Sequence, residues 1–555
     1  TGPIGELAGL QFSANGKALP WLRDPTNMYA FKLDIPKGVS RLDARYQFLS
    51  PLGIPGGSGG RVVFTQDMLG LQWNTVALYP AGMKSDDVTV QANLNLPPEW
   101  DLASALQVAQ REGNLVRFKS SNLTQLLDSP VYAGKYSKKV QLDNRNNIPV
   151  TLNLFADHPE SLALEPEQLA AHRQLVQQAY SVFGAPHYQH YDFLVAMSNY
   201  FSQIGLEHGQ STEIGVRPEL LTSWKTTASM RTVIPHEYVH AWNGKFRRPL
   251  DLLTPHYNVP MQNSLLWLYE GQTTYWTVVL SARANFLTQE QARENWALMA
   301  ALLSQRAGRA WRNLRDTTNE PIYNHRRGGD WRDWQRSADY YPEGALLWLD
   351  VDSKIRELTG DKKSLDQFAQ SFFSVPGSHM QPVPYTFADI VKALNNVVAH
   401  DWAGFLNTRL DSNQTGHLLD GFERSGWKLV YTDKPNDFAE PPAGERRDGD
   451  FRFSLGFTVG KNDQINNVVW GGPAFQAGIA GNTTLVAVNG RSYKFDLLKR
   501  AVVAAKTSTD PIELLLRTED RYHTVKLDYH GGLRYPHLEA ISGVPDRLTT
   551  LMKPL

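Results

Sequence analysis

The chain has 555 residues, of which 42% are apolar and 11% aromatic. This composition can bury substantial cores, and the length predicts about three domains. Lys and Arg together number 56, as do Asp and Glu, so no net field directs the chain to nucleic acid or to an anionic membrane. The absence of cysteine excludes disulfides and cysteine-ligated zinc, and leaves the redox compartment open. No run of eighteen apolar residues occurs, so no membrane span is predicted.

The first part of the chain has the alternating pattern of β-strands. Apolar residues alternate over 42–48, 88–96 and 150–154, which predicts an all-β N-terminal domain over residues 1–155. The glycine-rich loop at 53–60 lacks the Gly-Lys-Ser/Thr ending of a phosphate-binding loop. A flexible hairpin is therefore the better interpretation.

Helical periods dominate the next part, which predicts a mostly helical domain over residues 156–433. The expected helices include Glu165–Phe183, Thr226–Lys245, Gln289–Ala307 and Gly344–Leu358. Residues 434–450 are rich in proline, glycine and charge, which indicates a linker. We expect a compact β-rich module at 451–530 and a C-terminal tail at 531–555.

The segment 226–245 contains the string His236-Glu237-Tyr238-Val239-His240. Residues four apart on a helix share one face, so both imidazoles can point at one ion, and zinc favours neutral nitrogen ligands. Glu237 would lie about 100° round the helix, close enough to reach a metal-bound water without ligating the metal. This spacing is typical of a metallopeptidase. The alternative is a chance pairing of two histidines on a solvated helix face.

A catalytic zinc needs a third protein ligand. An extended three-histidine motif would require glycine at 243 and histidine at 246, where this chain has Asn243 and Phe246. Glu270 follows instead, at the start of another helix-like run, and would complete a His, His, Glu site. Its alternative role is a helix N-terminal glutamate favoured by the helix dipole. His256, in the loop between, is a weaker candidate ligand.

Upstream, Gly205-Leu206-Glu207-His208 follows a strand-like segment, 193–197. It resembles the Gly-x-Met-Glu-Asn strand of zinc aminopeptidases, whose glutamate binds the free amine of the substrate. A peptide α-amino group has a pKa near about 8 and is largely cationic at neutral pH, so it needs a carboxylate partner. Ile204 and His208 depart from the family pattern. The alternative for Glu207 is an ordinary carboxylate at a strand end.

Downstream, Tyr341-Pro342-Glu343-Gly344 resembles the Tyr-x-Lys-Gly segment of the same enzymes, whose tyrosine stabilises the tetrahedral intermediate. A phenol can donate a hydrogen bond to an oxyanion as its charge develops. Glu343 stands where the family has lysine, and the neighbouring Tyr340 leaves the assignment of the tyrosine open. Tyr341 could equally be a buried aromatic residue before a helix.

The C-terminal module has three landmarks of PDZ domains in the family's order. Ser454-Leu455-Gly456-Phe457 resembles the carboxylate-binding loop, and 472–479 and 485–490 resemble the segments that follow it. Such a loop presents backbone N–H groups to a chain-terminal carboxylate, and the adjacent strand edge accepts a peptide. Ser454 replaces the usual glycine. The alternative is that the module packs on the catalytic domain and binds nothing.

Together these motifs resemble one family, the M61 glycyl aminopeptidases, which are relatives of the M1 zinc aminopeptidases. The resemblance implies a multidomain α+β fold with a β-sandwich-like N-terminal domain, a thermolysin-like catalytic domain and a PDZ-like domain. It also implies one zinc ion per chain, peptide substrates with a free N-terminus, a preference for glycine or alanine, and a possible peptide ligand at the PDZ-like module. The chain begins at Thr1 rather than methionine, which indicates a mature form or a trimmed chain whose signal peptide, if any, has been removed. Together with the family resemblance, this favours a periplasmic or secreted protein without fixing the compartment.

The expected site follows from these assignments. Glu237 would take a proton from a metal-activated water and pass it to the leaving amine, Tyr341 would stabilise the oxyanion, and Glu207 would hold the substrate ammonium. The expected zinc ligands are His236, His240 and Glu270. Two alternatives remain: a zinc endopeptidase in which Glu207 has no role, and a catalytically dead peptide-binding scaffold. The intact glutamate at 237 argues against the dead enzyme.

Overall fold

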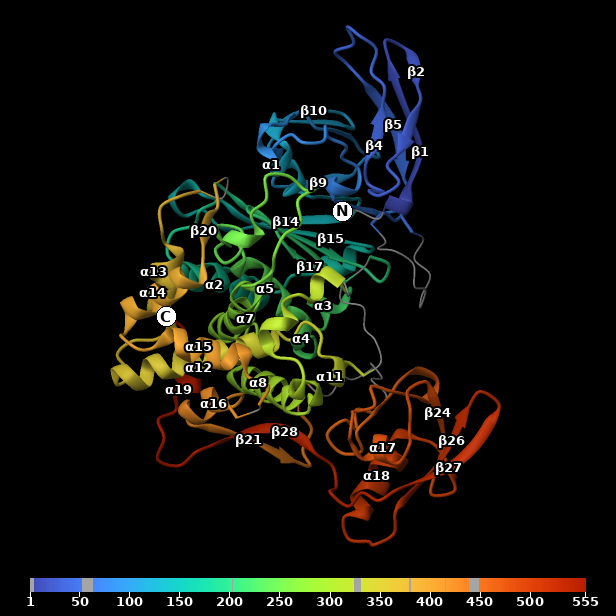
Figure 1. The fold of residues 1–555 in the computed structure, drawn as a ribbon, viewed down its shortest axis with the longest axis vertical. Helices are drawn as coiled ribbons and strands as arrows, with labels where there is room; N and C mark the ends of the chain where they lie inside the picture. The colour runs from blue at the N-terminus through green and yellow to red at the C-terminus, as the bar shows by residue number, and fades with distance from the viewer. Residues whose placement is uncertain are drawn as a thin grey trace.

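The computed structural model describes residues 4–51, 63–201, 203–323, 331–378, 381–414, 416–436, 438 and 449–555. The predicted hairpin at 53–60 lies outside these residues, as does most of the predicted linker at 434–450. The described part has a β-rich N-terminal region, a helical central region and a separate β-rich module near the C-terminus (Figure 1). The predicted multidomain α+β architecture is therefore confirmed at this level. Within the described ranges, no helix combines the length and the apolar character needed to cross a bilayer.

The N-terminal region consists of small antiparallel sheets. The outermost sheet projects from the molecule and contains β1 (Leu7–Ala14), β2 (Lys17–Leu19) and β5 (Asp43–Phe48) (Figure 1). The strand predicted at 88–96 is instead two short strands, β7 (Thr89–Val90) and β8 (Asn93–Asn95). They are separate because β7 pairs with β12 (Ser121–Asn122) and β8 pairs with β11 (Leu115–Phe118).

A five-stranded sheet forms the floor of the central region. Its order is β14-β15-β16-β18-β17, with the bounds Ser137–Asp143, Val150–Ala156, Tyr191–Met197, Ser211–Val216 and Ile204–Glu207. β15, β16 and β18 are parallel, and β17 is an antiparallel edge strand. The predicted N-terminal domain, 1–155, thus includes β14 and nearly all of β15, although both belong to the central sheet. Every residue of β15 is buried, because both faces of the sheet are covered: Leu152 and Leu154 lie in the central core, and Phe155 packs in a second cluster with Tyr132 of the N-terminal region.

Helices pack against this sheet around an aromatic core. The longest are α2 (Pro166–Phe183), α7 (Gly271–Arg283), α8 (Gln289–Ser304) and α12 (Pro342–Thr359), which match the predicted periods within a few residues. Among the described residues, six fully buried tryptophans belong to this core: Trp242, Trp267, Trp276, Trp296, Trp348 and Trp402.

Two glycines let α7 and α12 approach closely. A Cβ added at Gly271 would lie 2.7 Å from the Gly344 Cα, and one added at Gly344 would lie 2.7 Å from the Gly271 Cα. Real Cβ atoms essentially never come this near another heavy atom, so neither position has room for a side chain without a backbone shift. This contact brings the start of α12 beside the start of α7.

The single helix predicted over 226–245 is wrong. The segment forms two short helices, α4 (Ala228–Arg231) and α5 (Val233–Val239), and His240 follows as the C-terminal cap of α5. Pro235 explains the break, because it has no N–H to donate to the carbonyl of residue 231. Beyond His240 the chain turns and enters β19 (Arg247–Pro249).

The C-terminal module has its own hydrophobic core, separate from that of the central region. Its main sheet contains β22 (Thr458–Val459), β23 (Gln464–Asn466), β24 (Thr483–Val488), β26 (Ile512–Thr518) and β27 (Arg521–Leu527), with helix α18 (Phe495–Ala505).

The predicted tail at 531–555 is wrong, because the chain returns from the module to the central region. β28 (Tyr535–Ala540) pairs with β21 (Trp427–Thr432), which lies before the module in sequence. α19 (Arg547–Leu551) then buries Leu548 and Leu551 in the central core. The C-terminus accordingly lies against the central helices rather than beside the module (Figure 1).

Candidate metal centre and active site

His236, His240 and Glu270 converge on one point. His236 lies on α5, His240 caps it, and Glu270 lies between α6 (Leu266–Tyr269) and α7. The two histidine Nε2 atoms are 3.3 Å apart. Glu270 Oε2 is 3.5 Å from Nε2 of His236 and 3.3 Å from Nε2 of His240. Three ligand-type atoms on three sides of a common point are the donor set of a His, His, Glu metal site.

The far side of each imidazole ring is held by a hydrogen-bond acceptor. The carbonyl of Asn243 accepts from Nδ1 of His240 at 2.8 Å. Thr277 Oγ1 lies 2.9 Å from Nδ1 of His236 and donates its own hydrogen to the carbonyl of Thr273 at 2.8 Å, so it accepts from the histidine. With both Nδ1 atoms protonated, a neutral ring presents the lone pair of Nε2 to the shared point, as metal ligation requires.

The two oxygens of the Glu270 carboxylate have different surroundings. Its Oε1 accepts a hydrogen bond of 2.8 Å from the hydroxyl of Tyr341. Its Oε2 is buried and has no hydrogen-bond partner among the described residues. A buried carboxylate oxygen that faces two imidazole nitrogens is costly unless a cation compensates it. The residues present therefore fit a divalent metal ion of the zinc type.

The electrostatics of the centre favour a cation. Burial lowers the pKa of His240, but the Glu270 and Glu207 carboxylates outweigh that effect and raise the pKa to about 9. The same carboxylates attract a metal ion, so a proton and a metal compete for Nε2 of this ring. His256, the weaker candidate ligand, belongs to neither ligand group found within the described ranges; its Nδ1 accepts from the N–H of Asn258.

Two further carboxylates lie beside the candidate metal ligands. Atoms of Glu207, Glu237 and His240 lie within 4.8 Å of one another. Burial raises the pKa of Glu237 to about 8, and the neighbouring carboxylates Glu207 and Glu270 add to this rise against the attraction of His240. A Cβ at Gly205 would overlap the Glu237 carboxylate, so the β17 backbone passes directly over this side chain.

Glu207 stands at the end of the edge strand β17. The hydroxyl of Tyr269 donates to its Oε1 at 2.5 Å, which fixes the orientation of the carboxylate. Tyr269 is the last residue of α6, directly before Glu270. The structure thus places the sequence-predicted Glu207 at the same centre as the metal ligands.

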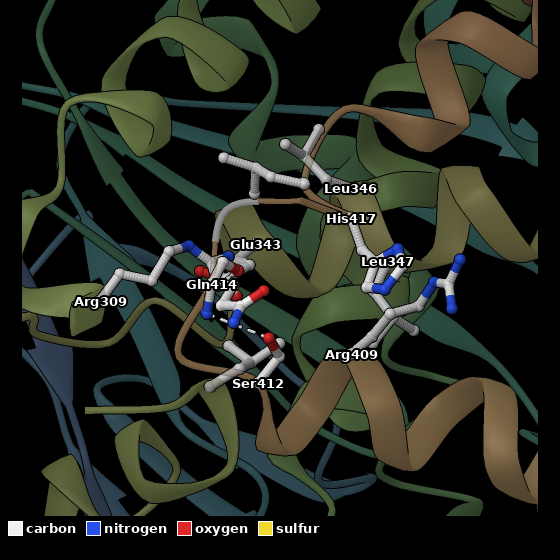
Figure 2. Close-up of a pocket in the computed structure, with 10 residues that line it drawn as sticks. Arg309, Glu343, Leu346, Leu347, Arg409, Ser412, Gln414 and His417 are labelled. Atoms are coloured by element: carbon white, nitrogen blue, oxygen red, sulfur yellow. Dashed lines mark hydrogen bonds and ion pairs between the residues drawn. The ribbon is translucent and has the colours of Figure 1, made fainter. Parts of the chain in front are cut away.

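The two adjacent tyrosines differ in position. Tyr341 caps the N-terminus of α12 and reaches Glu270 through its hydroxyl. Tyr340 is 1% exposed and belongs to the hydrophobic core. Glu343, where the resembling family has lysine, turns to the buried guanidinium groups of Arg309 and Arg336. Glu343 and Arg309 line a pocket (Figure 2) whose lining contains none of the candidate metal ligands.

The loop that resembles a carboxylate-binding loop uses its donors within the chain. The N–H groups of Ser454 and Gly456 both donate to the carbonyl of Phe451, at 3.1 and 2.9 Å. Asp450 pairs with Thr458 at the edge of β22. A peptide at this edge would have to replace residues 449–451. The possible peptide ligand of the module stays a prediction.

Family models match two parts of the chain. The model of the M61 glycyl aminopeptidase matches residues 229–347, which contain the metal-ligand cluster and Tyr341. The model of the peptidase M61 N-terminal domain matches residues 1–135. The chain is a member of the M61 peptidase family. It is therefore a peptide hydrolase, and the end of the second match agrees with the start of the central sheet at β14.

Two solved structures are similar to this chain, and the first of them shares its fold. An aminopeptidase N family protein from Idiomarina loihiensis is 18% identical, with a TM-score of 0.78, over 99% of this chain and 92% of that one. An M1 zinc metallopeptidase mutant from Deinococcus radiodurans, bound to a Tyr-Ser-Ala substrate, is 16% identical, with a TM-score of 0.46, over 74% of this chain and 86% of that one. Among curated proteins, none matches the chain.

The residues that hydrogen-bond to the far side of the site side chains were not predicted from the sequence. Thr277 and Asn243 orient the two histidines, and Tyr269 orients Glu207. Thr277 stands seven positions after Glu270 on the same helix, which places both on one face of α7. That spacing was a usable signal, whereas the contact between Tyr269 and Glu207 depends on the tertiary fold.

Proposed function

We propose that this M61 peptidase is a zinc aminopeptidase. His236, His240 and Glu270 would hold the ion, since their three ligand atoms converge and Glu270 Oε2 has no other partner among the described residues. Zinc, when bound, would polarise a water molecule and the scissile carbonyl. The remaining steps fall to side chains of this chain.

Glu237 serves as the general base and then as the general acid. Its carboxylate adjoins the metal ligands without sharing their convergence point, and burial raises its pKa to about 8. A carboxylate with a raised pKa can accept a proton from the attacking water and return it to the leaving amine near neutral pH. The presence of this group argues against a catalytically dead scaffold.

Tyr341 stabilises the oxyanion that forms at the scissile carbonyl. Its hydroxyl donates to Glu270 at 2.8 Å, so it lies at the edge of the metal-ligand cluster. A small rotation would transfer this donor to a negatively charged substrate oxygen as charge develops. The core position of Tyr340 supports Tyr341 in this role.

Glu207 carries the proposal that the enzyme is an aminopeptidase. Its carboxylate lies within 4.8 Å of ligand atoms of Glu237 and His240, so a third acidic group stands at the centre beside Glu237 and Glu270. With Glu237 ionised, as its role as general base requires, a divalent metal compensates two of these three charges. The α-ammonium of a substrate compensates the third. An endopeptidase substrate has no such charge at this position, which makes the zinc endopeptidase the weaker alternative.

The test compares free and blocked substrates on wild type and Glu207→Gln. Wild type should hydrolyse glycyl and alanyl arylamides and should act poorly on their N-acetylated forms, because acetylation removes the charge. Glu207→Gln should lower kcat/KM for the free-amine substrates by at least about 30-fold, the effect of losing one partner of a buried charge pair. Zinc content should stay at one ion per chain.

The same assay separates the alternatives. If wild type cleaves blocked or internal peptide bonds as fast as free-amine substrates, the enzyme is an endopeptidase and Glu207 is structural. The preference for glycine and alanine rests on the family resemblance alone, and it predicts that glycyl and alanyl substrates outpace leucyl ones.

The domain organisation is part of this proposal. We assign an N-terminal domain that ends near residue 135, a thermolysin-like catalytic domain from β14 to β21, and a PDZ-like module inserted before β28. The module's separate core and the turn at Ser454–Phe457 support the PDZ-like assignment.

A further inference from the structure

Four aromatic rings join the C-terminal module to the catalytic region. Trp470 of the module stacks on Trp334, with ring centroids 4.9 Å apart and an angle of 13° between the planes. Trp331 meets Trp470 and Phe475 edge-on, at 5.6 and 5.5 Å. The backbone N–H of Trp470 donates to the carboxylate of Asp333 at 2.5 Å. We call the rings of Trp331, Trp334, Trp470 and Phe475 the aromatic clamp.

The catalytic side of the clamp is α11 (Arg332–Gln335), which lies where the central region meets the module (Figure 1). Its flanks are conformationally strained. Trp331, Arg336 and Ala338 have φ angles of 64°, 56° and 51°, a region that side chains other than glycine rarely adopt. Such conformations persist only where surrounding contacts impose them, and they gather at functional segments. The clamp supplies contacts of this kind at Trp331.

Arg336 connects this strained segment to the active site. Its guanidinium is fully buried and donates to Asp339 at 2.7 Å and to Glu343 at 2.5 Å. These two carboxylates stand on either side of Tyr341 in sequence. The N–H of Tyr341 also donates to the carbonyl of Ala338 at 3.2 Å. The backbone around Tyr341 is therefore anchored to the segment that the module clamps.

We propose that the docked module positions Tyr341 through the aromatic clamp and Arg336, and thereby sets the turnover rate of the active site. This inference rests on the proposed role of Tyr341. Trp470 is a positioning residue, which touches neither substrate nor metal ligands. A module with this role acts on catalysis through its docked state, whether or not it also binds a peptide.

The test begins with Trp470→Ala in the full-length zinc-loaded protein. Trp470 lies outside the module's core cluster, so the module should stay folded. With glycyl-aminomethylcoumarin as substrate, kcat should fall about tenfold or more, because small displacements of a catalytic group are costly to rate. KM and zinc content should not change. The matched control is Tyr522→Ala, an aromatic residue on the exposed face of the same module, which should leave kcat unchanged.

A double-mutant cycle shows whether the effect passes through the tyrosine. Tyr341→Phe alone should lower kcat, and in that background Trp470→Ala should cost no more than about twofold, since the group that it positions is gone. Losses that multiply, or a Trp470→Ala variant with wild-type kcat, would overturn the coupling. If Tyr341→Phe itself keeps full kcat, the proposed role of Tyr341 fails instead.

A second variant covers the case in which Trp470→Ala does not fold. Asp333→Ala removes the acceptor of the Trp470 N–H and leaves all four rings in place. It should lower kcat in the same direction by a smaller factor and should also lose its effect in the Tyr341→Phe background. A kcat equal to wild type in this variant would count against the coupling.

Discussion

Thr277→Val should weaken zinc binding, although Thr277 is not itself one of the proposed zinc ligands. The threonine hydroxyl accepts the hydrogen of His236 Nδ1 at 2.9 Å. Valine keeps the shape of the side chain and removes this acceptor. His236 can then adopt one of two unfavourable states. In the first, the Nδ1–H is buried without an acceptor. In the second, the other tautomer places the hydrogen on Nε2, the nitrogen that should bind the metal.

The expected loss of zinc affinity follows from the first state, in which the Nδ1–H of His236 has no acceptor. A buried donor without a partner costs about 1–3 kcal/mol. This cost applies only when Nε2 must be the deprotonated nitrogen, so it appears as lost metal affinity. Zinc should therefore bind roughly 10–100-fold more weakly, the range known for residues behind metal ligands.

Competition with a chromogenic chelator measures the zinc Kd directly. Thr274→Val is the matched control, because Thr274 is on the same helix and its hydroxyl also donates to the carbonyl four residues earlier, at 2.8 Å. Thr274 has no bond to either histidine among those that the structure describes. Equal zinc Kd values for Thr277→Val, Thr274→Val and wild type would refute the assignment of the tautomer and of the ligand nitrogen.

Four further outcomes are expected. Glu237→Gln should retain zinc and lose about 10²–10⁴-fold in turnover; near-normal turnover with zinc bound would exclude the general base. Tyr341→Phe should lower kcat about 10²–10³-fold at nearly constant KM, whereas the same pattern in Tyr340→Phe alone would move the oxyanion donor to that residue. Leu548→Ala should lower the free energy of unfolding by about 2–5 kcal/mol, measured in urea, because α19 is part of the central core. Burial lowers the pKa of His172 from 6.5 to about 4, so the folded state resists its protonation and loses stability as the pH falls through this range; His172→Phe should flatten that pH dependence of the unfolding midpoint.

The convergence of the three candidate ligands could be predicted because their arrangement is local. His236 and His240 share a helix face by spacing alone, although the helix itself is shorter than its period indicated. Glu270 could be predicted to join them because it stands just before the next helix, α7. The partners on the other side of the rings could not be predicted in the same way, since Thr277 and His236 meet only when α7 packs on α5.

The domain limits were harder to predict because they depend on strand pairing between distant segments. β14 and β15 alternate like the strands before them, yet β15 pairs in parallel with β16, across the length of α2. Likewise, β28 pairs with β21 across the whole module. A period in the sequence identifies a strand, but nothing in it identifies the sheet that the strand joins.

The departure at Glu343 follows from the fold rather than weakening the active-site assignment. In the resembling family the equivalent residue is a lysine, yet here the side chain pairs with Arg309 and Arg336 and is only 4% exposed. An acidic residue at this position is required by two buried guanidinium groups, one of which also binds Asp339. Replacing it with lysine would bring a fourth cation into a cluster that already holds Arg306, Arg309 and Arg336. The charge at 343 therefore belongs to the network that anchors the start of α12, next to the Gly271–Gly344 contact between α7 and α12.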